Sequence, residues 1–469
     1  MTERIVDVAI IGAGTAGLAA YKAARASTEN VLLIERGAYG TTCARVGCMP
    51  SKLLIAAANA AEAVRVAPEF GIHASLPDID GAAVMERVRR MRDSFVAAIL
   101  EDVANLPAQT KLRGHARFEG ADALVVDGPE GRTRVRAKRI VIATGSEPLV
   151  PDTFKTVRPD TSDTLFEWTR LPSSAAVFGN GIIGLELGQA LARLGVRVRL
   201  FGKDGLVGPL TDPAVLGAAR DTMGERLDFV PHYELAALRG KGTGITVDYA
   251  DGERAYSGTF ERVLVAIGRT PNVAGLDLST TGLELGEGGV PSFDRTTGRC
   301  GDSPIFIAGD AMNDAPLLHE ASATGRLAGR RAADDTAPSA ERTVPFSVVY
   351  CEPQIAMVGE TFRELEERKA AFVTGKVDWA AQGRARIMGE AAGTLSLYAD
   401  GSTGRILGAE MIGPRAEHIG HHLALAMTAR LGVTEMLRAP LYHPTFEEGL
   451  GTALEDAASQ LSGERLAAE

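Results

Sequence analysis

Short apolar runs that close on small residues recur along this chain and predict buried strands. The first run, Val6–Ile11, is interrupted only by Asp7, as expected of a strand that is buried on both faces of a parallel sheet. An alanine-rich stretch continues to about Ala26 and favours a helix. A second apolar run, Val31–Ile34, ends at Glu35. This order of strand, helix and strand is typical of an α/β domain with a parallel sheet.

A glycine-rich turn joins the first strand to its helix. It reads Gly12-Ala13-Gly14-Thr15-Ala16-Gly17. In such a turn the first glycine allows the tight bend, the second lets a pyrophosphate approach the backbone, and the third lets the helix pack closely. The helix start receives the phosphates, and Glu35 can accept a hydrogen bond from a ribose hydroxyl. The complete arrangement predicts a dinucleotide site rather than a mere tight turn.

The same arrangement returns in the middle of the chain. The run Ala175–Phe178 leads into a second turn, a helix to about Leu194 and a strand over Val196–Phe201. Its turn glycines are Gly179, Gly181 and Gly184. Where a glutamate would bind the ribose diol of NAD, this strand ends instead in Gly202-Lys203. Lys203, with Arg199, could bind the 2′-phosphate of NADP. The third glycine favours NAD instead, and Lys203 could simply be a solvated side chain without a ligand. The choice between NADH and NADPH therefore stays open.

Further buried strands close on small residues and fit a flavin. They are Ile140–Gly145 and Ile305–Asp310, and Val263–Arg269 repeats the design in the second nucleotide unit. Doubly wound sheets place ligand groups at the carboxyl ends of such strands. The residues expected there are Thr144, Gly145, Gly268 and Asp310. Any one of these segments alone is more often a core strand.

Two cysteines lie close together between Thr42 and Lys52. Cys43 and Cys48 have four residues between them, which leaves room for a disulfide. Pro50 suits the first helical position, so Cys48 should lie at or just before the positive end of a helix dipole, where a thiolate is stabilised. Lys52 follows one helical turn later and should point at whatever Cys48 faces. We predict a redox pair; a structural disulfide or two unrelated thiols is the alternative.

Composition bounds the class of protein. The 469 residues suit about three domains. A content of 45% hydrophobic and 23% charged residues is ordinary for a globular protein. Only four cysteines occur, Cys300 and Cys351 being isolated, which argues against a disulfide-stapled secreted protein. No leader or apolar run of about 18 residues is seen, so we expect a cytoplasmic protein without a membrane span. A net charge of −10 disfavours nucleic acid, and no metal is expected.

With the cysteine loop, two glycine turns and Gly309-Asp310 in this order, the chain resembles the flavoprotein pyridine nucleotide-disulfide oxidoreductases. Within that family it is most similar to the dihydrolipoyl dehydrogenases. The resemblance covers nearly the whole chain, and its most specific element is His443-Pro444-Thr445-Phe446-Glu447-Glu448. In this family such a histidine reaches the redox disulfide of the partner subunit, and an acid five residues on orients its ring.

The resemblance implies a role for each of these residues. Cys43 would be the interchange thiol, and Cys48 the thiolate against the flavin. Lys52 would lie near the flavin N5 and pair with Glu186, while His443, oriented by Glu448, would exchange protons with the thiols. The positions that match the family's FAD contacts are Gly12, Gly14, Gly17, Glu35, Thr144, Gly145 and Asp310, with His319 near the pyrimidine end.

The family architecture also implies a fold and an assembly. The fold class is α/β, with two Rossmann-like dinucleotide-binding domains, for FAD and NAD(P), and a C-terminal α+β dimerisation domain. The expected boundaries are 1–150 for the first part of the FAD domain, 151–270 for the NAD(P) domain, 271–342 for a central segment that completes the FAD site, and 343–469 for the interface domain. Because His443 would act in the other protomer, we expect a homodimer.

Departures from the family pattern leave the substrate open. The usual loop reads Gly-Gly-Thr-Cys, whereas this chain has Gly40-Thr41-Thr42-Cys43 followed by Arg45, an added cation that should favour thiolates. The alanine-rich helix after Lys52 favours a long apolar disulfide such as lipoamide over glutathione. An NADPH-dependent reductase of another low-molecular-weight disulfide is the alternative enzyme. A flavin-binding structural subunit with an idle redox pair is the alternative of another class.

Overall fold

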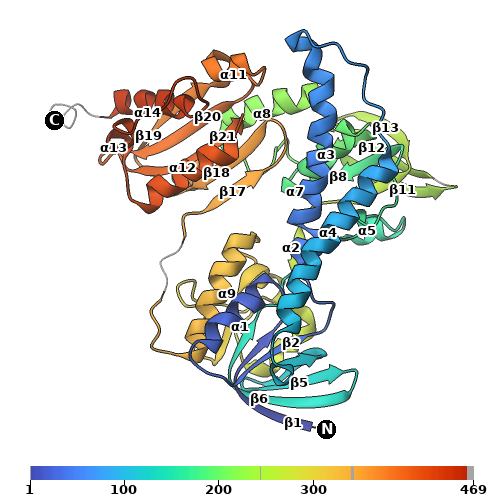
Figure 1. Cartoon of the computed structure of the whole chain (residues 1–469), viewed down its shortest axis with the longest axis vertical. Helices are drawn as coiled ribbons and strands as arrows, with labels where there is room; N and C mark the ends of the chain where they lie inside the picture. The colour runs from blue at the N-terminus through green and yellow to red at the C-terminus, as the bar shows by residue number, and fades with distance from the viewer. Residues whose placement is uncertain (1, 243, 340–342, 462–469) are drawn as a thin grey trace. The chain divides into compact units, whose positions relative to one another are not determined.

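The computed structural model describes residues 2–242, 244–339 and 343–461 of the chain, which form two compact units (Figure 1). The described residues of the first unit are 2–53, 86–149 and 268–339, and those of the second are 54–85, 150–242, 244–267 and 343–461. No helix among the described residues is long and apolar enough to cross a membrane.

A seven-stranded sheet forms the centre of the first unit, in the order β3-β2-β1-β6-β5-β4, with β16 also paired to β6. Pairs among β3, β2, β1, β6 and β16 are parallel, and β6-β5-β4 are antiparallel. Its strands are β1 (Thr2–Ile11), β2 (Val31–Glu35), β3 (Lys111–Arg113), β4 (His115–Gly120), β5 (Ala123–Gly128), β6 (Gly131–Ile142) and β16 (Ile305–Ile307). The inner half of β1 is buried on both faces, which confirms the strand predicted from its apolar run.

Two helices, α1 (Thr15–Arg25) and α9 (Leu318–Ala333), cover one face of this sheet and lie against each other (Figure 1). Their backbones approach closely because α9 carries glycine where α1 crosses it. A Cβ atom on Gly325 would lie 2.3 Å from the Ala16 carbonyl oxygen, and one on Gly329 would lie 2.2 Å from that of Ala20. Only glycine fits at such contacts.

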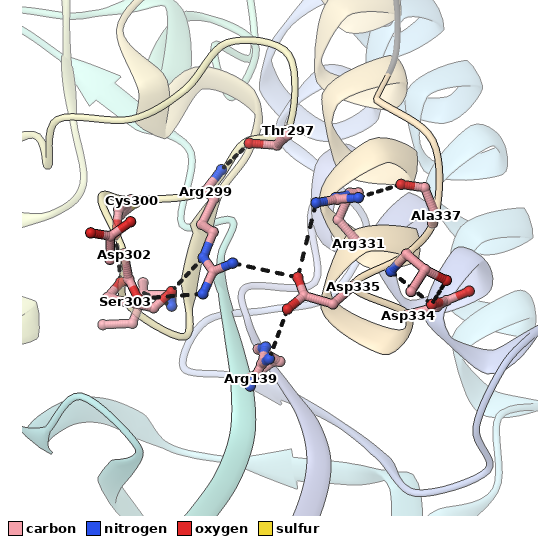
Figure 2. A network of polar contacts seen from close by, with 12 residues as sticks. Arg139, Thr297, Arg299, Cys300, Asp302, Ser303, Arg331, Asp334, Asp335 and Ala337 are labelled. Carbon is pink, nitrogen blue, oxygen red and sulfur yellow. Dashed lines mark hydrogen bonds and ion pairs between the residues drawn. The ribbon is translucent and has the colours of Figure 1, made fainter.

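Asp335 fixes the chain just beyond the end of α9. Figure 2 shows three guanidinium groups turned toward its carboxylate, from Arg139 on β6, Arg299 before β16 and Arg331 on α9. The nitrogen-to-oxygen distances are 3.1, 3.5 and 4.0 Å, respectively. Arg299 also donates to the Ser303 carbonyl oxygen at 2.9 Å. These partly exposed contacts hold the end of α9 to β6 and to the segment that precedes β16.

The cysteine loop folds into two consecutive helices, α2 (Thr42–Val46) and α3 (Cys48–Val66). The helix predicted to begin at Pro50 begins instead at Cys48. Proline is tolerated there because N–H groups in the first helical turn have no intrahelical partner. Thr41 caps α2 by accepting a hydrogen bond from the Ala44 N–H at 3.3 Å. Its backbone has φ 53° and ψ 150°, a conformation that is strained for any residue except glycine.

The second unit contains the other predicted nucleotide fold. Four parallel strands lie in the order β10-β9-β8-β14, and a three-stranded antiparallel sheet, β11-β12-β13, accompanies them. The elements are β8 (Ser174–Phe178), α7 (Ile182–Arg193), β9 (Arg197–Phe201), α8 (Pro213–Arg226), β10 (Asp228–Val230), β11 (Glu234–Lys241), β12 (Gly244–Asp251), β13 (Arg254–Phe260) and β14 (Arg262–Val265).

The C-terminal part of the second unit is a five-stranded antiparallel sheet, β17-β18-β21-β20-β19, packed against helices. Its elements are β17 (Phe346–Val349), β18 (Gln354–Gly359), α10 (Phe362–Glu367), β19 (Phe372–Asp378), α11 (Gly383–Ile387), β20 (Thr394–Asp400), β21 (Ile406–Gly413), α12 (Ala416–Thr428), α13 (Val433–Leu437) and α14 (Glu448–Gln460). Glu410 on β21 is fully buried and accepts from the N–H groups of Thr211, Asp212 and Phe362 at 2.6, 2.9 and 2.9 Å. This carboxylate joins the start of α8 to the sheet.

The remaining elements are α4 (Gly81–Ala104), α5 (Asp152–Lys155), α6 (Ser162–Leu165), β7 (Ser146–Pro148) and β15 (Arg269–Pro271), with short 3-10 turns between elements. Together the elements confirm the predicted α/β class, with two Rossmann-like sheets and a C-terminal α+β part. The division of the chain at residues 150, 270 and 342 stays a prediction, and residues 340–342, next to the last boundary, lie outside the described residues.

Gly329→Ala should destabilise the protein by about 2 kcal/mol, because the added methyl group must push the α9 and α1 backbones apart. Gly217→Ala is the matched control: it also lies within a helix, α8, but a Cβ there meets no atom within 4 Å. That change should raise stability by about 0.5–1 kcal/mol. Thermal unfolding followed by far-UV circular dichroism measures both. A Gly329→Ala protein as stable as wild type would contradict the packing described.

A pair of substitutions at Thr41 separates the cap from the backbone strain. Thr41→Ala removes a cap worth about 1 kcal/mol and leaves a side chain at positive φ. Thr41→Gly removes the same cap and also relieves a strain of about 1–3 kcal/mol. We therefore expect the glycine variant to unfold at a higher temperature than the alanine variant. Equal or reversed unfolding temperatures would show that Thr41 is not strained.

Candidate active site

The two cysteines of the loop lie side by side with their thiols reduced. The Cys43 side chain is half-buried and Cys48 is exposed. A hydrogen bond between the two thiols, followed by burial and by negative charge on Cys48, raises the pKa of Cys43 far above its ordinary value, and Lys52 opposes this rise. In the reduced pair the contact with Cys48 therefore favours the protonated form of Cys43. The spacing predicted this proximity correctly.

The local structure explains how Cys48 can carry a charge. Cys48 is the first residue of the 19-residue helix α3, so the positive end of the helix dipole acts on its sulfur. Ser51 donates to the Cys48 carbonyl oxygen at 3.0 Å and holds this first turn. Lys52 follows one turn later. Arg45, expected to add a cation, donates instead to the carbonyl oxygens of Ala38 and Tyr39 at 3.2 and 3.5 Å.

The predicted histidine and glutamate pair is present near the C-terminus. His443 Nδ1 lies 2.8 Å from Glu448 Oε1, and the other carboxylate oxygen accepts from the Thr445 N–H at 3.0 Å. These two hydrogen bonds lower the pKa of Glu448, so its carboxylate stays charged at neutral pH. The ring itself is exposed. Because Glu448 occupies Nδ1, the ring is oriented with Nε2 as its proton-exchanging atom.

Glu186 is buried on α7 in the second unit, with 4% of its surface exposed. Its Oε1 accepts a hydrogen bond from the Tyr350 N–H at 3.0 Å. Nothing in the sequence around Glu186 pointed to Tyr350, which lies 164 residues away. The expected pairing of Glu186 with Lys52 stays a prediction, as does the action of His443 on the cysteines of a partner.

The first glycine turn has the shape that FAD requires. Gly12 has φ +107°, and a Cβ there would lie 2.2 Å from the Ala143 carbonyl oxygen; one on Gly17 would lie 1.8 Å from that of Gly12. Beside Gly14 there is no atom within 4 Å, so the start of α1 is open to a phosphate. Glu35, at the end of β2, accepts from the Ala13 N–H at 2.7 Å. The acid is thus held beside the turn.

Other predicted FAD residues cluster at the carboxyl ends of β6 and β16. Thr144 Oγ1 is buried and has no hydrogen-bond partner among the described residues, as expected of a group that awaits a ligand. Asp310 accepts from Ser146 Oγ at 2.8 Å, and Arg269 Nε donates to the same Ser146 Oγ at 2.8 Å. Ser146 and Arg269 were not predicted from the sequence, because only the pairing of β7 with β15 brings them together.

Three more positions predicted to bind a cofactor are Gly145, Gly268 and His319. Gly145, with φ +70°, allows the bend after β6, and Gly268, with φ +136°, accepts from the Leu149 N–H at 3.0 Å. His319 is half-exposed at the start of α9, 3.9 Å from Glu320. The residues of the first unit therefore fit FAD, with an open phosphate cradle, a held acid and an unpaired hydroxyl.

The second glycine turn repeats the first in detail. A Cβ on Gly179 would lie 2.1 Å from the Ala266 carbonyl oxygen, and one on Gly184 would lie 1.9 Å from that of Gly179. A Cβ on Gly181 would have no atom within 4 Å. The start of α7 is therefore open in the same way as that of α1. This geometry fits the pyrophosphate of a second dinucleotide.

The end of β9 differs from the expected pair of cations. Arg199 is not joined to Lys203, because its guanidinium binds Asp228 at 2.8 Å and the Tyr249 hydroxyl at 2.9 Å. Lys203 is exposed, and its carbonyl oxygen accepts from Asn180 at 3.1 Å. Two groups that the sequence analysis missed lie near the same loop. A Cβ on Gly205 would lie 2.9 Å from both Arg220 Nη2 and His232 Nε2.

The two remaining cysteines lie away from the loop as buried thiols. Burial raises the pKa of Cys300 to about 12. The pKa of Cys351 is also raised, by burial and then by the nearby carboxylates of Glu186 and Glu352. Neither thiol is exposed. Both isolated cysteines are therefore ordinary buried thiols.

Comparison with protein families matches nearly the whole chain. Residues 6–325 match the family described as pyridine nucleotide-disulphide oxidoreductase, and residues 345–454 match the dimerisation domain of the same family. The second match includes α12, the first half of α14 and the His443–Glu448 pair. It supports the expected homodimer.

Among curated proteins, the chain is 32% identical to a dihydrolipoyl dehydrogenase of Halobacterium salinarum, with 96% of each chain covered. It is also 32% identical to a mercuric reductase of Streptomyces lividans, with 97% of each chain covered. Because the two relatives are equally similar to this chain, sequence identity does not decide which of their reactions it catalyses.

Among solved structures, the chain resembles LpdA of Mycobacterium tuberculosis, with a TM-score of 0.82, 25% identity and coverage of 97% of this chain and 99% of that one. The HOCl-induced flavoprotein disulfide reductase RclA of Escherichia coli has the same TM-score at 23% identity, covering 96% and 99%. The chain therefore belongs to the pyridine nucleotide-disulphide oxidoreductase family, whose members contain FAD and use NAD(P)H.

Proposed function

We propose that this protein is a homodimeric dihydrolipoyl dehydrogenase that moves an electron pair between a dihydrolipoyl group and NAD(P) through Cys43 and Cys48. The observation that carries the proposal is the contact of the two thiols, with Cys48 at the positive end of the helix dipole of α3, where a thiolate is stabilised. The small-molecule or carrier-bound dithiol would enter at Cys43.

The substrate dithiol would transfer its two electrons to the cysteine pair by ordinary thiol–disulfide exchange. A substrate thiolate attacks Cys43 Sγ of the oxidised pair, the Cys43–Cys48 bond breaks, and Cys48 leaves as a thiolate. The second substrate thiol then attacks the substrate sulfur of the mixed disulfide and releases Cys43. The substrate becomes a disulfide, and the cysteine pair gains two electrons. A base must take a proton from the substrate, and an acid must return one to Cys43.

His443 of a second copy would serve as that base and acid, as the family resemblance implies. Its Nδ1 is held by Glu448, which fixes the tautomer and stabilises the positive charge that forms on the ring. The charged state of Glu448 supports this role at neutral pH. Lys52, held by Glu186, would stabilise negative charge at the flavin.

FAD would be held in the first unit by Gly12, Gly14, Gly17, Glu35, Thr144, Gly145 and Asp310, with His319 near its ring end. When bound, it supplies a two-electron relay between the cysteine pair and the nicotinamide. The nicotinamide coenzyme would be held at Gly179, Gly181 and Gly184 in the second unit, with Gly268 as a further contact.

A second candidate is an NADPH-dependent reductase of another low-molecular-weight disulfide. It is favoured by the end of β9, where Lys203 replaces the expected acid and the loop at Gly205 lies against Arg220 and His232. These basic groups suit the additional phosphate of NADP. Against glutathione, the first exposed turns of α3 contain no cluster of basic residues.

Anaerobic titration of the purified, FAD-loaded protein tests the proposal. Two electrons from NADH should produce the long-wavelength band of a thiolate-to-flavin charge transfer, and lipoamide should then restore the oxidised spectrum. Cys48→Ser should abolish both the band and disulfide turnover. Cys300→Ser, which removes a buried thiol of the same unit, should retain both.

The alternatives predict different results in the same titration. Reduction by NADPH in preference to NADH, with recovery by glutathione disulfide but not lipoamide, would favour the second candidate. Bleaching of the flavin without a long-wavelength band would mean that the cysteine pair is outside the electron path. Unchanged disulfide turnover in Cys48→Ser would support the flavin-binding structural subunit.

Glu448→Gln should lower lipoamide-linked turnover about 100-fold, because the neutral amide no longer stabilises positive charge on His443. Direct reduction of ferricyanide by the NADH-reduced flavin should stay unchanged, since that reaction needs no thiol. Steady-state assays of both reactions on one preparation provide the measurement. Equal losses in the two reactions would assign Glu448 a structural role instead.

A further inference from the structure

We propose that Gln189 is a positioning residue that sets the orientation of Glu186, and through it of Lys52, by clamping the loop between β17 and β18 onto α7. The inference rests on the proposed function in one respect, namely that Glu186 and Lys52 act together at the flavin. All the contacts that support it lie within the second unit.

The clamp begins with a row of polar side chains on one face of α7. Glu186, Gln189 and Arg193 stand at positions i, i+3 and i+7, so they share one side of the helix. Glu186 and Gln189 are 4% and 5% exposed. Buried polar groups of this kind are costly unless each is hydrogen-bonded, so their partners determine what the row does.

Gln189 binds the loop backbone in both directions. Its Nε2 donates to the Glu352 carbonyl oxygen at 2.8 Å, and its Oε1 accepts from the Glu352 N–H at 2.7 Å. Two residues earlier in the same loop, the Tyr350 N–H donates to Glu186 Oε1 at 3.0 Å. Cys351, between them, closes the loop with a hydrogen bond to the Pro353 carbonyl oxygen at 3.1 Å. The loop is therefore fixed at two neighbouring points of α7.

The third member of the row connects α7 to the helix that starts at Cys48. Arg193 Nη1 donates to Asn59 Oδ1 on α3 at 2.7 Å, and the carboxylates of Glu62 and Glu352 act electrostatically on the same guanidinium. The later turns of α3 and the β17–β18 loop are thus held by the same face of α7. This face therefore contacts both the later turns of α3 and the loop that holds Glu186, all within the second unit.

The physical effect of losing the clamp follows from these contacts. Without Gln189, the Glu352 N–H and C=O lose their partners in a buried place, and the loop must shift to regain hydrogen bonds. A shift moves the Tyr350 N–H away from Glu186. The carboxylate then loses a charge-assisted hydrogen bond and its fixed orientation. In the proposed function, Lys52 would thereby lose the fixed position of its counter-ion.

Gln189→Leu tests this chain of effects in the FAD-loaded full-length protein. We expect the thiolate-to-flavin band of the two-electron-reduced enzyme to shift or weaken, and the rate of lipoamide-linked reduction to fall about tenfold. Gln189→Glu is a second variant that retains an acceptor for the Glu352 N–H but loses the donor, and it should show a smaller change of the same kind.

Gln354→Leu is the matched control. Gln354 on β18 is 6% exposed and also makes two hydrogen bonds, to the side chain and N–H of Glu417 at 3.4 and 3.2 Å, away from α7. Its loss should lower the unfolding temperature as the loss of Gln189 does, and leave the band unchanged. A band that changes equally in both variants would reduce the role of Gln189 to general stability.

A double-mutant cycle with Glu186→Gln identifies the route. If Gln189 acts through Glu186, Gln189→Leu should change the band much less in the Glu186→Gln background than in wild type. Additive effects, or an unchanged band in Gln189→Leu, would overturn the inference while the proposed function stands. Absence of the band in the wild-type protein would overturn the proposed function and this inference with it.

Discussion

Close backbone contacts at the two glycine turns are the constraint on which both nucleotide folds depend. In each turn the third glycine lies against the carbonyl oxygen of the first, and the first lies against the carbonyl oxygen of a neighbouring strand, with no room for a Cβ. These contacts bring α1 and α7 down onto their sheets and leave both helix starts open. The approach of α9 to α1 through Gly325 and Gly329 extends the same principle to the opposite side of α1. A steric constraint thus creates two phosphate cradles before any ligand binds.

The elements that the sequence predicted well are those whose signals are local. The β1 strand, the turn at Gly12 and the acid at Glu35 lie within one short stretch, and each is visible as a residue type at a fixed spacing. The contact of Cys43 with Cys48 and the pair of His443 with Glu448 are local in the same sense. Where the local signal was ambiguous, the prediction erred: Pro50 is compatible with any place in a first helical turn, and α3 begins at Cys48.

The features that escaped prediction depend on tertiary contacts. Gln189 and Glu352 are 163 residues apart, and Thr211 and Glu410 are 199 residues apart, so no spacing rule could join them. Arg199 was expected to serve a phosphate, but Asp228 arrives from the next strand and binds it. Thr41 shows a different limit, because its residue type gives no indication of a positive φ. Only the resemblance to a loop with glycine at that place hinted at the conformation.

The burial of Cys300 and Cys351 has a consequence for how this protein meets oxidants. Both thiols are 0% exposed and have raised pKa values, so they present almost no thiolate to peroxide or hypochlorous acid. Of the four cysteines, Cys43 and Cys48 are therefore the two that an oxidant can reach. A sulfenic acid on either thiol has the other beside it as a resolving thiol, and condensation to the disulfide prevents the irreversible step to a sulfinic acid. In the proposed function this disulfide is also the oxidised form that the dithiol substrate reduces, so such damage would be reversible.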